Sequence, residues 1–139
     1  MKTTPFLLVL FAAAATAGEG GFKVVVNSRC EEASISREEL SRLFLKKTAR
    51  WACGDPVVAV DRADDSDLRA RFTSDVHRKS VNAVKAYWLH QIFSGQDVPP
   101  PEKSTDEEVL DFVRGHASGI GYVSRGALAP GVHVLEVRP

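Results

Sequence analysis

The residues best suited to chemistry lie in one short segment, 61–69, where two arginines, four aspartates and a serine follow an apolar run. Arg62 and Arg69 carry guanidinium forks that suit phosphate, sulfate or carboxylate. Ser66 offers a hydroxyl and a helix cap, and the free backbone amides at a helix start favour oxyanions. We therefore predict an oxyanion-binding site that uses Arg62 and Ser66, with Asp64 and Arg69 beside them.

The same segment has two plainer interpretations. Ser66 can be a cap alone, with the carboxylates of Asp64, Asp65 and Asp67 solvated and favoured by the helix dipole, and four carboxylates together repel an anion. Asp61 adds a further oxygen ligand for calcium, but the glycine and closing glutamate of an EF-hand loop are missing. We predict no metal site, and the solvated loop stays open as an alternative to the anion site.

Enzyme and nucleic-acid functions find no support in the residue pattern. No GxSxG, HExxH or P-loop motif occurs, so we predict neither an enzyme nor a bound cofactor. The four histidines lack the spacing of zinc ligands; they are His77, His90, His116 and His133. With 18 basic and 18 acidic residues the net charge is zero, so a nucleic-acid partner is not expected.

The first 17 residues have the pattern of a cleavable signal peptide. Lys2 precedes an apolar run over 6–15 that is too short to cross a bilayer, and Ala15-Thr16-Ala17 offers the small residues of a cleavage site. We predict one domain over 18–139, exported to the periplasm by the general secretory route; an uncleaved membrane anchor is the alternative. In that oxidising compartment Cys30 and Cys53 are expected to form a disulfide, which would stabilise the fold by about 3 kcal/mol.

Strand and helix patterns alternate along the predicted domain. Apolar, β-branched runs predict strands over 22–27, 57–60, 119–123 and 132–137. Helices are expected from Ser36, Ser66, Ser80 and Thr105, two of them with a glutamate three residues after the cap. This order predicts an α/β domain with a short, mostly parallel sheet flanked by helices. The strand over 57–60 is then followed by the helix from Ser66. Open α/β sheets bind ligands in the crevice at the end of a strand, next to the start of the following helix.

Seven short pieces occur in an order and spacing that resemble a known group. The pieces are Val24-Val25-Val26-Asn27, Leu43-Phe44-Leu45-Lys46-Lys47, Trp51 to Asp55, Tyr87-Trp88, Ile92-Phe93-Ser94-Gly95, Pro99-Pro100 and Gly119-Ile120-Gly121-Tyr122-Val123. Together they resemble short, single-domain relatives of the phosphate-binding proteins of ABC transporters, in the type 2 periplasmic binding protein superfamily. The resemblance implies the fold of a single lobe of such a protein.

The resemblance also carries an expectation for the crevice. Arg62-Ala63-Asp64-Asp65-Ser66 lines up with the first five positions of the Arg-x-Asp-x-Ser-Gly-Thr segment of full-length members, which implies that Arg62 and Ser66 contact phosphate. Asp67 and Leu68 replace the Gly and Thr, and Lys46 replaces the glycine usual after the first helix.

Because the chain is long enough for only one lobe, its half-site stays open to water, where charged hydrogen bonds are weaker. We therefore predict an extracytoplasmic solute-binding-like module that binds phosphate or a similar oxyanion weakly, with a partner protein or a second copy completing the site. The alternative is an interaction module of a membrane transport or sensing complex that kept the fold without binding a ligand.

Overall fold

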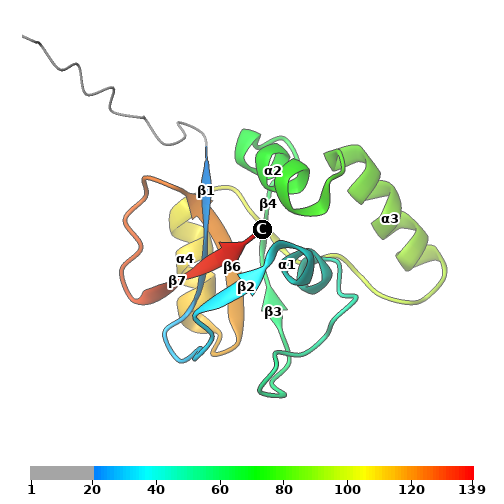
Figure 1. The fold of residues 1–139 in the computed structure, drawn as a ribbon. Coiled ribbons are helices and arrows are strands. Elements are labelled where there is room, and N and C mark those ends of the chain that lie inside the picture. Colours follow the sequence, from blue (N-terminus) through cyan, green and yellow to red (C-terminus); the bar gives the residue numbers. More distant parts are fainter. Residues whose placement is uncertain (1–20) are drawn as a thin grey trace, which may run out of the picture.

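The computed structural model describes residues 21–139, so the predicted signal peptide lies outside the described residues. Figure 1 shows the elements in chain order. They are β1 (Phe22–Asn27), β2 (Ser34–Ser36), α1 (Arg37–Phe44), β3 (Val58–Ala59), β4 (Asp61–Arg62), α2 (Asp67–Phe72), the π-helical turn η1 (Thr73–His77), α3 (Val81–Phe93), β5 (Glu102–Lys103), α4 (Asp106–Gly115), β6 (Gly119–Ser124) and β7 (Val132–Arg138). No helix in this part of the chain is both long and apolar enough to span a membrane.

The main sheet has five strands in the order β2-β7-β1-β6-β3. The central strand β1 runs antiparallel to both β6 and β7, whereas the outer pairs β2–β7 and β3–β6 are parallel. The α/β class is confirmed, but this sheet is mixed rather than mostly parallel. The reason is that β1 lies between two strands from the far end of the chain, and no short connection fixes their relative direction.

The apolar run over 57–60 does not form one strand that ends at Asp61. Val58 and Ala59 pair with β6, and the Val60 amide still bonds to the Ile120 carbonyl at 2.9 Å. The chain then leaves the main sheet, and β4 pairs with β5 in a separate two-stranded sheet. This crossing places Asp61 and Arg62 in the interior, 5% and 7% exposed.

Apolar side chains fill both faces of the main sheet. On the face covered by α1 and α2, the rings of Phe72 and Tyr122 stack with centroids 3.8 Å apart, and Phe44 packs beside them. On the other face, α4 packs closely over β6 at Gly121. A Cβ at Gly121 would lie 2.7 Å from Val109 Cγ1 and 2.8 Å from Val60 Cγ1, so only glycine permits this approach.

The predicted helix starts are confirmed by their caps. Ser36 Oγ accepts a hydrogen bond from the Glu39 amide at 3.1 Å, and Thr105 Oγ1 accepts one from the Glu108 amide at 3.2 Å. Each cap satisfies an amide that the helix itself leaves free.

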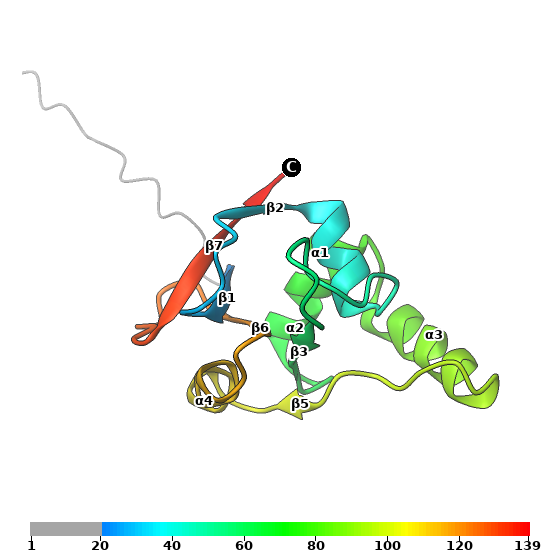
Figure 2. The ribbon, with the colours of Figure 1, turned by 90° about the horizontal axis from the view of Figure 1, so that it is seen from below.

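Helix α3 stands at the side of the molecule and is only half covered (Figures 1 and 2). Val84, Trp88 and Ile92 recur every four residues along one face of this helix; Val84 and Trp88 are buried, but Ile92 is 46% exposed. The second half of the helix therefore extends past the core.

Cys30 and Cys53 are free thiols in the structure, so the predicted disulfide is not present in it. Cys30 lies in the turn just after β1 and is partly buried, and this burial raises the pKa of its thiol. Cys53 is exposed in the connection before β3. Pairing depends on how that connection folds back, which the cysteine count alone does not determine.

Candidate functional site

Arg62, at the end of β4, is the first of the predicted ligand residues, and its side chain points into the protein. One terminal nitrogen forms a short ion pair with Asp106 at the start of α4, and the other donates to the Ser104 carbonyl at 3.1 Å. Partial burial raises the pKa of Asp106, but hydrogen bonds from the Ser124 amide and from Arg62 outweigh it and hold the pKa below its usual value. Arg62 thus joins β4 to α4 and, through Asp106, to the end of β6.

Arg69, on α2, is also enclosed, with its side chain 4% exposed. Its Nη1 donates to the Arg62 carbonyl at 2.6 Å and to Glu102 Oε1 at 3.2 Å. Its Nε lies 3.4 Å from Asp61 Oδ1. The guanidinium therefore bridges α2 to both strands of the small sheet.

Asp61 is the buried centre of this network. Burial raises the pKa of its carboxyl, and the positive charge of Arg69 and hydrogen bonds from the Tyr122 hydroxyl and the Arg62 amide act in the opposite direction. Burial and the Asp61 carboxylate together raise the pKa of Tyr122, which keeps the phenol protonated as a donor. Because Tyr122 also stacks on Phe72, the ionic network is anchored directly in the core.

Asp64 and Ser66 have local partners as well. Asp64 accepts a hydrogen bond from Lys85 on α3 at 2.8 Å, and this exposed contact lowers the pKa of Asp64. Ser66 Oγ accepts from the Arg69 amide at 3.3 Å, which is the geometry of a cap. All four predicted ligand residues therefore have partners within the chain.

The carboxylates that complete this network were not predicted from the sequence. Glu102 and Asp106 follow a proline-rich connector some forty residues after Arg62, and Asp106 has only the pattern of an acidic first helical turn. Tyr122 lies on a strand whose pattern indicated packing alone. No sequence pattern predicted the strand Glu102–Lys103, so nothing indicated its pairing with β4.

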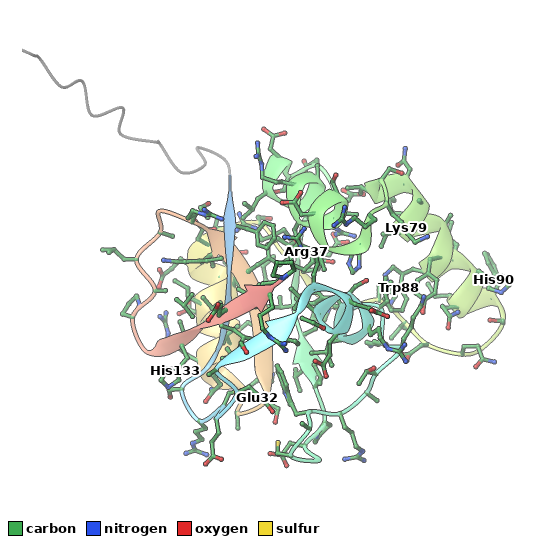
Figure 3. All side chains as sticks on the ribbon, viewed as in Figure 1. Glu32, Arg37, Lys79, Trp88, His90 and His133 are labelled. Carbon is green, nitrogen blue, oxygen red and sulfur yellow. The ribbon has the colours of Figure 1, made fainter. Side chains whose placement is uncertain are left out.

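An apolar groove of about 210 Å³ opens beside the network. Its lining comprises Asp61, Arg69, Lys85, Trp88, Leu89, Ile92, Pro99, Pro100 and Glu102. Figure 3 shows Trp88 on the side of α3 that faces the body and His90 on the outer side. The groove therefore lies between the second half of α3 and the proline connector, with the paired charges at its base.

One serine–histidine contact also lies outside this site. Ser41 Oγ and His77 Nδ1 are 2.7 Å apart. Burial, followed by the charges of Arg69 and two lysines, lowers the pKa of His77 to about 4. A ring this weakly basic is a poor general base at neutral pH, so we assign the contact to packing of η1 against α1.

The mixed sheet and the helices that cover its faces define the class: the chain has the fold of one lobe of a periplasmic binding protein. An ABC-type phosphate transport receptor from Vibrio cholerae superposes with a TM-score of 0.67 at 17% identity, over 84% of this chain and 46% of that one. A phosphate ABC transporter substrate-binding protein with bound phosphate from Clostridium perfringens also gives 0.67, at 18% identity, over 84% and 44%.

A phosphate-binding protein from Planctomyces limnophilus gives a TM-score of 0.61 at 16% identity, over 85% of this chain and 41% of that one. The chain thus spans less than half the length of these structures, and at such identities the likeness is one of fold. No sequence family and no curated protein matches the chain. The resemblance inferred from the sequence is confirmed for the fold.

Proposed function

We propose that this chain works outside the cytoplasm as a single-lobe, solute-binding-like module that has kept the fold of a phosphate receptor and acts through protein contacts. The observation that carries the proposal is the internal pairing of Arg62 and Arg69 with Asp106, Glu102 and Asp61. Neither guanidinium keeps a free charge for a solute at the crevice.

An anion entering the crevice would have to displace a carboxylate that is already bound. Asp106 is held by both Arg62 and the Ser124 amide, and Arg69 is held from two sides. Opening a buried ion pair costs about 3–5 kcal/mol, whereas an anion in a half-open site gains only weak, solvated contacts. Affinity for free phosphate at this position is therefore expected to be low.

The surface available for a protein contact is the exposed apolar side of α3 and the groove beside it. Four large apolar side chains here are 46–86% exposed: Leu89, Ile92, Phe93 and Val98. We infer that a second copy of this chain covers this surface. The structural neighbours are a little more than twice as long as the matched region, so two copies restore the size of a whole receptor. A membrane transport or sensor protein is the other occupant to be tested.

The experiment is light scattering of the purified protein over a concentration series. Wild type is expected to pass from monomer to dimer, and Phe93→Ser, which changes the most exposed large apolar side chain of α3, is expected to stay monomeric. Leu128→Ser is the matched control, because Leu128 is 87% exposed on a different loop. A wild-type protein that stays monomeric at every concentration would contradict the second copy and leave a foreign protein partner as the occupant.

Weak oxyanion binding at the crevice is the second candidate function. The Nε atoms of Arg62 and Arg69 are buried and lack a hydrogen-bond acceptor among residues 21–139. Calorimetric titration with phosphate and with sulfate separates the two functions. Heat that disappears in a folded Arg62→Ala variant would support this candidate, and no heat at millimolar phosphate would favour the interaction module.

A further inference from the structure

A second pocket, of about 380 Å³, lies away from the α3 groove and shares no lining residue with it. It is formed where the start of β1, the end of β7, α2 and η1 meet. Its lining comprises Gly21, Phe22, Lys23, Val24, Arg37, Arg71, Asp75, Arg125, Leu135 and Val137. Figure 3 places Arg37 where the start of α1 meets the end of β7.

Three arginines line this pocket without a partner in the described part of the chain. The side chains of Arg37, Arg71 and Arg125 form no ion pair and no hydrogen bond with residues 21–139. The Nε of Arg37 is moreover fully buried with no acceptor. An unsatisfied buried donor is costly, and an acceptor from outside the described residues would satisfy it.

The charge of the pocket is strongly positive. Besides the three guanidinium groups it contains Lys23, whose ammonium group donates to the Ala127 carbonyl, and only one carboxylate, Asp75. The net charge of the whole chain is zero, so this concentration of positive charge is local. Guanidinium groups from separate segments that converge on one pocket suit a ligand with several anionic oxygens.

The remaining lining is mostly apolar and comes from the start of β1 and the end of β7. Phe22, Val24, Leu135 and Val137 supply this wall. The volume is in the range of small-molecule sites and exceeds what one inorganic ion fills. We propose that this pocket binds a small organic anion that carries two or more carboxylate or phosphate groups, with Arg37, Arg71 and Arg125 as its ligands and the apolar wall against its carbon skeleton.

The test is calorimetric titration of the protein at low salt with citrate as the organic polyanion and inorganic phosphate as the simple one. Citrate is expected to bind more tightly than phosphate. The double variant Arg71→Gln, Arg125→Gln should weaken citrate binding at least tenfold, because it removes two guanidinium groups that donate charge-assisted hydrogen bonds to the anion. Both side chains are exposed, so the variant is expected to fold, and a thermal melt verifies this.

Two single variants refine the test. Arg29→Gln removes an exposed positive charge beyond the far end of β1 and should leave citrate affinity unchanged. Asp75→Asn removes the one carboxylate of the pocket and should tighten binding about threefold, the size of an exposed charge pair.

Four outcomes would overturn the proposal. The first is that millimolar citrate gives no heat, and the second is that the double variant binds citrate as tightly as wild type. The third is that Arg29→Gln loses as much citrate affinity as the double variant, and the fourth is that phosphate binds but citrate does not. Loss of binding in Arg62→Ala alone would place the anion at the β4–α2 crevice instead. Self-association through α3 is measured by light scattering and anion binding by calorimetry. A negative result in one experiment therefore does not affect the proposal that the other experiment tests.

Discussion

The protein contains two groups of arginines in opposite states. Arg62 and Arg69, in the segment that resembles a phosphate-binding motif, are buried and bound to carboxylates from β4, β5 and α4. The arginines at 37, 71 and 125 match no motif, yet they surround a pocket without partners in the described chain. The availability of a guanidinium charge therefore depends on whether the fold brings a carboxylate to it, not on the motif in which it lies.

The largest expected effect concerns two arginines that lie two positions apart on α2. Arg69→Ala leaves the buried Asp61 without its cation and should lower the free energy of unfolding by about 3–5 kcal/mol. Arg71→Ala, at an exposed position of the same helix, should change it by less than about 0.5 kcal/mol. Urea denaturation measures both. Equal losses would show that the two groups do not differ in their structural role.

A pH titration measures the combined effect of burial and of the charges of Arg69 and two lysines on His77. Burial and Arg69 lower the pKa of His77 from 6.5 to about 4, so the unfolded chain binds a proton in this interval and the folded chain does not. Stability conferred by neutral His77 is complete above pH 6.5 and should fall by about 2–3 kcal/mol as the pH drops to 4.

His77→Gln should flatten that pH dependence, whereas His90→Gln, on the outer side of α3, should keep it. Denaturation curves recorded between pH 4 and 7 provide the measurement. A slope that persists in His77→Gln would assign it to other groups.

Removing the carboxylate that pairs with Arg62 should make this arginine resemble the unpaired arginines at 37, 71 and 125. In Asp106→Asn the charge of Arg62 is no longer neutralised, so phosphate affinity at the crevice should rise about tenfold, at a cost of about 1–2 kcal/mol in stability. Asp111→Asn is the control on the same helix, because Asp111 pairs only with the exposed Arg114. Calorimetry that finds no gain in Asp106→Asn would mean that the crevice is closed by packing rather than by charge.

The smallest effect concerns Lys46, whose only ion pair among the described residues is a 3.5 Å contact with the exposed Asp97. Lys46 has φ 55°, in the left-handed region, where the resemblance led us to expect glycine. Lys46→Gly should therefore raise stability by about 0.5–1 kcal/mol, whereas Lys47→Gly, next to it and without a positive φ, should not. Thermal melts compare the two variants, and an equal response would argue against backbone strain at position 46.

Much of the fold was predictable because its signals are local. The caps at Ser36, Ser66 and Thr105 and the strands at both ends of the domain depend on residues within a few positions of one another. The predicted disulfide, in contrast, is not a local feature, because it requires two separate segments of the chain to meet. The structure leaves both thiols free. The exposure of Ile92, one turn after the buried Trp88, could not be predicted either, since helical spacing does not show how far the core extends.

The sequence by itself determined the class of fold, its longer strands and capped helices, and the presence of arginines between a strand and the helix that follows it. Only the tertiary structure decided which of the chain's arginines are neutralised. A guanidinium is attracted to the nearest carboxylate in space, and for Arg62 and Arg69 those groups arrive from β4, β5 and α4 once the small sheet has formed. For Arg37, Arg71 and Arg125 no described carboxylate comes within pairing distance, and their positive charge stays available to a ligand.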